Sequence, residues 1–251
     1  MDITHIWFIL VAFFFVGYFV LDGFDFGVGM CLPLLGKDDT DRRVMINTIG
    51  PVWDLNETWV IVAGAVLFAA FPEWYASVFS GFYLPLLLIL LALILRGVSF
   101  EYRHQRKHPE WARRFDLMII VGSVVPAFLW GVAFANIVRG LPMDADHNVQ
   151  ANLLDLLNPY ALLGGVTLLL LCLLHGAIFI ALKTTGEIRG RARSLVSKAA
   201  LPTIVVAAGF LVWTVIMHSG IGHIAWVVGL AGLAALALVA AVVFNGLGRE
   251  G

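Results

Sequence analysis

The chain has 251 residues, of which 61% are hydrophobic and only 13% are charged. A soluble domain usually carries about 25% charged residues, and a soluble fold of this length could not bury so much apolar surface. The composition therefore excludes an ordinary soluble protein and predicts an all-α integral membrane protein, a polytopic helix bundle surrounded by lipid. The formal net charge of −1 says little about partners, and no nucleic-acid partner is expected.

Seven segments are apolar and long enough to cross a bilayer, which takes about 20 residues in a helix. In chain order, the expected spans are 6–31, 49–72, 74–95, 117–138, 158–182, 199–217 and 223–244. The first two reach this length only by including acidic residues, Asp22 and Asp25 in one, Asp54 and Glu57 in the other. No Lys or Arg precedes the first run, so we expect it to be kept as a helix rather than cleaved as a signal peptide.

Basic residues crowd every second link between the expected spans. These links hold Lys37, Arg42 and Arg43; then Arg103, Arg106, Lys107, Arg113 and Arg114; then Lys183, Arg189, Arg191, Arg193 and Lys198. The alternate links hold one basic residue in total, Arg139, and Arg249 follows the last span. Because short basic links stay in the cytoplasm, the N-terminus is predicted to lie outside.

Combining depth with this topology places five acids and one arginine from four spans near the cytoplasmic side. They are Asp22, Asp25, Asp54, Glu57, Arg96 and Asp116. The pairs Asp22/Asp25 and Asp54/Glu57 are spaced i,i+3, so each pair is expected to share a helix face. A charged side chain at the centre of a span costs about 2.5 to 3.5 kcal/mol. We therefore expect these groups to face the bundle interior.

Two interpretations of this constellation remain open. It can form a proton-conducting route from the cytoplasm, since burial and a nearby arginine shift carboxylate pKa values in opposite directions; Asp54 is then the sharpest candidate. It can instead be a structural ion-pair network, with Arg96 bonded to Asp25 or Asp116. Asp22 and Asp116 can also simply flank helix ends.

The remaining candidates are weaker. His175 lies in the middle of the fifth span and could ligate haem, but a core histidine is favoured because no second ligand stands at matching depth. His218 and His223 bracket a short outer turn, which a wet interface explains. Cys31 and Cys172 form no CxxC motif, so no metal site is expected.

Several stretches carry a family resemblance. The stretch LDGFDFGVGM at 21–30 is similar to the first-helix signature of subunit II of cytochrome bd quinol oxidases. The stretch NTIGPVWDLNETW at 47–59 also resembles a signature of that family. FAAFP at 68–72, WGVAFAN at 130–136 and NPYALLGG at 158–165 also resemble that family, in its order and spacing.

The resemblance implies a respiratory terminal oxidase of the bacterial cytoplasmic membrane. Quinol would be oxidised at the outer face, and dioxygen reduced to water with protons from the cytoplasm. Haem b, haem d and the quinol site are expected mainly in subunit I, the haem-bearing partner, with small accessory subunits as further candidate partners. This chain would support subunit I, bind no haem securely by itself, and not be catalytic alone.

Family roles carry over by motif position. Asp54 resembles the carboxylate of a proton-delivery path, with Glu57 beside it, and Trp59 resembles a residue near the oxygen access route. Three further positions resemble polar residues linked to assembly and haem retention: Asp25, Arg96 and Asp116.

Two departures from the family pattern stand out. Leu55 follows Asp54 where the family usually shows Gly, which would narrow a water path. Family members usually have about two more helices beyond the seventh. We therefore expect a first four-helix bundle at 1–140 and a second, incomplete bundle of about three helices at 141–251.

Two other functions compete with the oxidase subunit. A proton-coupled membrane transporter fits seven spans and buried acids equally well, although transporters often show broken helices at matching points of two repeats, and no such symmetry is visible. A purely structural membrane scaffold for subunit I is the other alternative.

Overall fold

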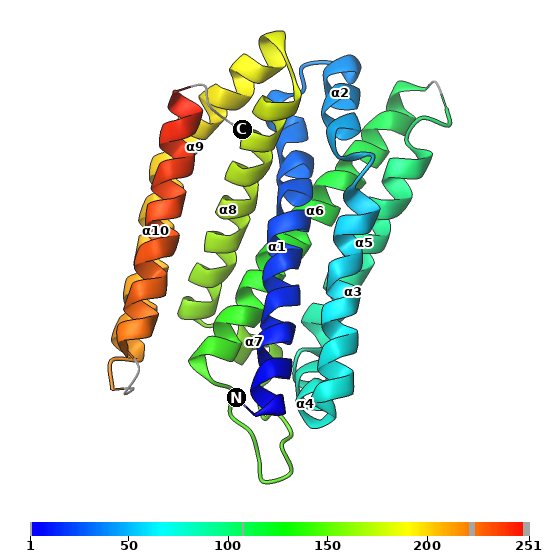
Figure 1. Ribbon diagram of the computed structural model, residues 1–251. Coiled ribbons are helices and arrows are strands. Elements are labelled where there is room, and N and C mark those ends of the chain that lie inside the picture. Colours follow the sequence, from blue (N-terminus) through cyan, green and yellow to red (C-terminus); the bar gives the residue numbers. More distant parts are fainter. Residues whose placement is uncertain (1, 107, 221–223, 248–251) are drawn as a thin grey trace.

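The computed structural model describes residues 2–106, 108–220 and 224–247. Its helices are α1 Ile3–Leu35, α2 Asp39–Ile49, α3 Trp53–Ala70, α4 Pro72–Gly81, α5 Tyr83–Tyr102, α6 Pro109–Arg139, α7 Leu153–Leu156, α8 Pro159–Lys183, α9 Gly186–Met217 and α10 Ile224–Gly246. The long helices run side by side along one direction (Figure 1). The described residues contain no strand, apart from one isolated antiparallel bridge between Met143 and Val149. The all-α prediction is confirmed.

Among the described residues, six helices are long and apolar enough to cross a membrane: α1, α5, α6, α8, α9 and α10. The pair α2 and α3, bent by 48°, makes a seventh if it counts as one span. The bend falls at Gly50, Pro51 and Val52, where Pro51 has no N–H to continue a helical ladder. The prediction of about seven spans is confirmed, with this second span broken near its start.

The third span differs from its prediction. A single helix was expected over 74–95, but α4 ends at Gly81, Phe82 leaves the helical conformation (φ −102°, ψ 21°), and α5 continues to Tyr102. Pro72 and Glu73 make a favourable N-terminus for α4. Arg96 therefore lies inside the span rather than at its inner end. Tyr102 lies six positions further along the helix, roughly 9 Å along its axis.

Other helices extend past the predicted spans. α1 has 33 residues and so measures about 50 Å, more than the roughly 30 Å hydrocarbon core. α9 begins at Gly186 rather than near 199, so its early arginines belong to the helix itself. Lys107, His223 and Arg249 lie outside the described residues.

α1 is the central helix, packed against α3, α6 and α8. Its outer half is largely exposed, whereas its inner half, from Asp22 to Leu32, is almost wholly buried. This inner half supplies much of the apolar core, in which Val28, Cys31 and Leu32 meet Ile180 of α8. The acids of α1 are therefore held in the most enclosed part of the molecule.

Gly27 and Gly176 allow α1 and α8 to pack closely. A Cβ on Gly27 would collide with the Cys172 carbonyl and with the Gly176 backbone, and a Cβ on Gly176 would collide with the Gly27 backbone. Neither obstacle is a flexible side chain that could move aside. Small residues at helix crossings are a usual device in membrane bundles, because they let two backbones approach.

Replacing Gly176 by Val is expected to force α1 and α8 apart and to destabilise the bundle by about 1 to 3 kcal/mol, as overpacking does. The thermal unfolding midpoint in detergent measures this loss. Gly209 of α9 is the matched control, because a Cβ there meets nothing within 4 Å. Equal midpoints for the two valine variants would contradict this packing account.

The basic links gather at one end of the bundle. Figure 1 shows α2, the α5–α6 link and the α8–α9 link together, with the N-terminus, α4 and α7 at the opposite end. The basic links thus lie at the end opposite the N-terminus, as the charge pattern predicts. The same pattern predicts that the basic end lies in the cytoplasm.

A cysteine placed at Gln105, in the basic α5–α6 link, is expected to resist a membrane-impermeant thiol reagent in intact cells. A cysteine at Ala145, in the α6–α7 link at the other end, should react. Both positions are exposed, and the natural Cys31 and Cys172 are buried, so background labelling should be low. Ready labelling at 105 with protection at 145 would reverse the topology.

Candidate functional site

Arg96 is the centre of a buried ion-pair cluster. Its side chain is fully buried, and its Nη2 donates to Asp22 Oδ1 at 2.6 Å and to Glu57 Oε2 at 3.0 Å. The guanidinium also lies 4.3 Å from the centre of the Phe26 ring. One arginine of α5 thereby joins carboxylates of α1 and α3, and we call Asp22, Asp25, Asn56, Glu57 and Arg96 the inner cluster.

Asp25 occupies the same cluster but has a different partner. Asn56 Nδ2 donates to Asp25 Oδ2 at 2.8 Å, and both side chains are buried. Asp25 lies one turn beyond Asp22, so the two point to the same side of α1, as their spacing predicts. The neutral amide of Asn56 is the donor that the structure gives to Asp25.

The expectation that Arg96 bonds Asp25 or Asp116 is wrong. Its partners are Asp22 and Glu57. The shifted register of the third span explains this, because Arg96 lies deeper than predicted and meets α1 at the level of Asp22. Asp22 does face the bundle interior, as one of the two interpretations expected, and the alternative that it only flanks a helix end is wrong.

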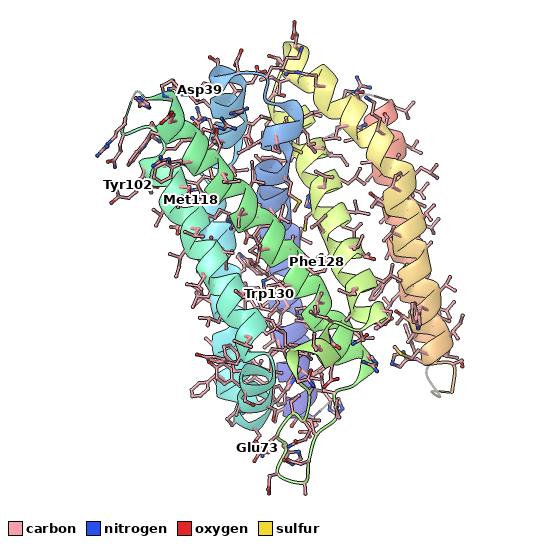
Figure 2. All side chains as sticks on the ribbon, turned by 180° about the vertical axis from the view of Figure 1, so that it is seen from behind. Asp39, Glu73, Tyr102, Met118, Phe128 and Trp130 are labelled. Atoms are coloured by element: carbon pink, nitrogen blue, oxygen red, sulfur yellow. The ribbon has the colours of Figure 1, made fainter. Side chains whose placement is uncertain are left out.

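Asp116 belongs to a second cluster closer to the end of the bundle. Arg103 Nε donates to Asp116 Oδ1 at 2.6 Å, Arg103 Nη2 donates to Asp39 Oδ1 at 2.8 Å, and Arg42 Nη1 donates to Asp116 Oδ2 at 3.2 Å. Burial alone would lower the pKa of Arg103, but Asp116 and then Asp39 hold that pKa above its ordinary value. This cluster ties α2, α5 and α6 together near the end where Asp39 and Tyr102 lie (Figure 2).

Asp54 does not enter either cluster. It is exposed on α3, so the prediction that it faces the bundle interior beside Glu57 is wrong. The buried face of α3 carries Asn56, Ala63 and Leu67, and at 100° per residue Asp54 lies about 160° from Asn56 around the helix. Around the axis of α3, Glu57 lies between the exposed side of Asp54 and the buried side of Asn56, and 21% of its side chain is exposed.

Trp59 packs between α1 and α3. Its ring lies 5.8 Å from that of Phe13 and 5.7 Å from that of Phe14, and a Cβ on Gly17 would clash with it. The absence of a side chain at Gly17 therefore makes room for the indole.

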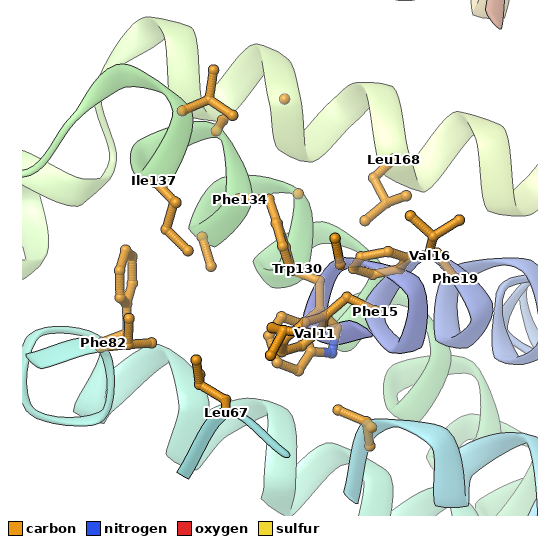
Figure 3. A pocket seen from close by; sticks show the side chains of 18 of the residues that line it. Val11, Phe15, Val16, Phe19, Leu67, Phe82, Trp130, Phe134, Ile137 and Leu168 are labelled. Carbon is orange, nitrogen blue, oxygen red and sulfur yellow. The ribbon is translucent and has the colours of Figure 1, made fainter. Parts of the chain in front are cut away.

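An apolar cavity of about 560 Å³ lies in the outer half of the bundle. Figure 3 shows Val11, Phe15, Leu67, Trp130 and Phe134 around it. Val60, the residue after Trp59, also lines it. Its described lining residues include no His, Cys or Met, the side chains that usually ligate haem iron.

His175 does not make a convincing haem ligand. Its ring packs against Phe24 at 5.5 Å, and Phe24 stacks on Phe179 at 4.1 Å. The partly buried imidazole thus packs edge-on against Phe24, as a core histidine does. Across the described residues, no group of three or more His, Cys, Asp or Glu side chains could hold a metal ion.

Sequence reasoning missed Asn56, Arg103, Arg42 and Asp39 as members of the two clusters. Asn56 could have been noticed because it is a polar residue inside the NTIGPVWDLNETW stretch, one position before Glu57. The structure shows that it lies on the buried face of α3. The arginines were taken only as markers of sidedness. The acids that pair with these arginines, Asp39 and Asp116, lie in or beside the same basic links. Acids and arginines together in such links indicate ion pairs at the ends of the spans.

These features define a polytopic helical membrane protein that holds a charged cluster inside the bundle near one end. The chain belongs to the family described as cytochrome bd terminal oxidase subunit II, whose sequence profile matches residues 3–251. It is 49% identical over 197 residues to cytochrome bd ubiquinol oxidase subunit 2 of Bacillus subtilis, a match covering 78% of this chain and 58% of the relative. With cytochrome bd-I ubiquinol oxidase subunit 2 of Escherichia coli K12 it shares 42% identity over 215 residues, covering 84% and 57%.

A solved structure of bd oxidase from Geobacillus thermodenitrificans has a similar fold. The TM-score is 0.70 at 17% sequence identity, covering all of this chain and 84% of that one. At this identity the likeness shows the fold alone. The chain spans less than three fifths of the length of the two curated relatives described above.

Proposed function

We propose that this chain serves as subunit II of a quinol-oxidising, oxygen-reducing oxidase in the bacterial cytoplasmic membrane. Its partner would be the haem-bearing subunit I, which would carry haem b, haem d and the quinol site. Family membership over residues 3–251 is the main support, and both curated relatives are described as subunits of ubiquinol oxidases. Reactions at haem would take place on subunit I; the residues of this chain would hold the assembly together and handle protons.

The exposed position of Asp54 supports a partner-facing role. A carboxylate on the lipid-facing side of a span is costly, so the face of α3 that carries Asp54, Thr58 and Ile61 is better covered by protein than by lipid. Asp54 also lies in the first turn of α3, where the helix dipole favours a negative charge. We therefore place the proton-delivery carboxylate at the contact with subunit I, with Glu57 one turn deeper as the link to the inner cluster.

The two buried clusters fit roles in assembly. Arg96 bridges three helices, and Asp116 with Arg103 and Arg42 bridges three as well. Breaking a buried pair leaves an uncompensated charge and is strongly destabilising. Asp25, Arg96 and Asp116 would thus support haem retention indirectly, by fixing the helices that subunit I packs against.

Trp59 and the apolar cavity support a route for dioxygen. Dioxygen is small and apolar and dissolves in the membrane interior. The cavity is an apolar space, and Val60, the residue that follows Trp59, forms part of its wall. In the same proposal, residues 1–140 form the bundle that holds both charged clusters and lines most of this space, and Leu168 and Phe210 of the second bundle close it. Residues 141–251 form the remaining helices of a second bundle.

Complementation tests this function. Cells whose own subunit II gene is deleted should regain quinol-dependent oxygen consumption when the complete gene for this protein is supplied. A purely structural scaffold would restore oxygen consumption equally with the wild-type protein and with Asp54→Asn, whereas the proposed function predicts restored haem but little oxygen consumption with that variant. A chain that reaches the membrane yet restores neither haem nor oxygen consumption would favour the transporter.

A further inference from the structure

The inner cluster contains more carboxylates than cations. Asp22 and Glu57 bond the guanidinium of Arg96, Asp25 lies one helical turn from Asp22, and Asp22, Asp25 and Arg96 are all 0% exposed. With every group ionised, this buried set would carry two excess negative charges. A low-dielectric interior does not stabilise unpaired charge, and a buried acid in that position takes up a proton instead.

The neighbouring arginines do not offset this excess. Arg103 and Arg42 are bonded to Asp116, with Arg103 also bonded to Asp39. Arg191 is bonded to Asp41. Each of these cations already has a carboxylate partner of its own. One of the two excess charges can stay on Glu57, which is partly exposed; the other is neutralised within the fully buried part of the cluster.

The three carboxylates are not equivalent. Asp22 accepts a 2.6 Å charge-assisted bond from Arg96, and Glu57 accepts one at 3.0 Å while keeping part of its side chain exposed. Asp25 accepts only from the neutral Asn56 amide, through Oδ2. Asp25 Oδ1 and Asp22 Oδ2 both lack a hydrogen-bond partner among the described residues, so what distinguishes Asp25 is that no cation bonds its other oxygen.

From this geometry we infer that Asp25 is a neutral carboxylic acid in the folded protein, carrying the proton on Oδ1 while Oδ2 accepts from Asn56. The charged groups around it are Asp22 of α1, Glu57 of α3 and Arg96 of α5. A proton from cytoplasmic water converts the carboxylate to the acid, and its release restores the carboxylate. A role for this proton in the reduction of dioxygen rests on the proposed function. The protonated state of Asp25 does not depend on it.

Infrared spectroscopy of the purified, intact complex tests the inference without turnover. The wild type should show the carbonyl stretch of a protonated carboxylic acid, shifted in D2O. Asp25→Asn, which replaces a neutral acid by a neutral amide of the same shape, should remove that band and leave the thermal midpoint nearly unchanged. Asp22→Asn and Glu57→Gln should keep the band. An unaltered band in Asp25→Asn would overturn the assignment.

Asp25→Glu covers the case in which the asparagine variant fails to assemble. The longer acid should move the band to a new frequency, and an unmoved band would also overturn the inference. Oxygen consumption is measured separately. If the band belongs to Asp25 but oxygen consumption is unchanged in Asp25→Asn, then Asp25 is protonated and is not needed for proton delivery. That result would contradict only the proposed role of Asp25 in the proton route.

Discussion

Replacing Asp54 by Asn is expected to leave an assembled complex with normal haem content that loses most of its quinol-dependent oxygen consumption. Reduction of dioxygen to water consumes four protons, which need a polar route through the membrane. Asparagine keeps the shape and hydrogen-bonding capacity of aspartate but cannot carry a proton. A tenfold loss corresponds to roughly 1.4 kcal/mol added to the limiting barrier. Oxygen uptake per haem, with quinol in excess, measures the effect.

Asp54→Glu should retain part of the activity, because it restores a titratable carboxylate on the same exposed face of α3. Glu73→Gln is the matched control, since Glu73 is an exposed acid at the opposite end of the bundle (Figure 2). Full respiration by an assembled Asp54→Asn complex would falsify proton delivery through this residue. Failure to assemble would mean that Asp54 braces the contact with the partner.

Replacing Arg96 by Leu is expected to cause the largest loss of stability. The change removes the donor of two bonds and leaves Asp22 and Glu57 facing each other without a cation. Removing one partner of a buried ion pair typically costs about 3 to 5 kcal/mol. The complex should therefore unfold at a lower temperature and retain less haem after purification.

Arg106→Leu is the matched control for this experiment. Arg106 is exposed in the α5–α6 link, where it stacks on Trp111 at 4.5 Å. An exposed contact of that kind contributes little, so the control should keep wild-type haem and stability. Equal thermal midpoints for Arg96→Leu and the control would exclude a structural role for Arg96.

The number of spans, and the burial of Asp22 and Asp25 inside the first one, could be predicted from the sequence. Lipid forces each crossing to be a long apolar helix, so runs such as 117–138 and 158–182 had one plausible structure. The same constraint makes every interrupting acid conspicuous, and Asp22, Asp25 and Glu57 do meet. Basic links fixed which ends lie together.

Pairing within the cluster could not be predicted in this way. Hydropathy does not distinguish one span over 74–95 from a short helix, a break at Phe82 and a span that ends at Tyr102. That shift of register decides whether Arg96 reaches Asp22 or Asp116. The orientation of Asp54 depends on rotation of α3 about its axis, which α1 packing sets through Asn56 and Ala63.

The most direct test of the oxidase-subunit assignment is a visible absorption spectrum of the complex purified through a tag on the full-length protein, followed by separation of its subunits. We expect bands of haem b and haem d that stay with a co-purifying larger subunit and are absent from this chain once it is separated. A colourless preparation of this protein alone, stable and without a haem-bearing partner, would contradict its assignment as an oxidase subunit.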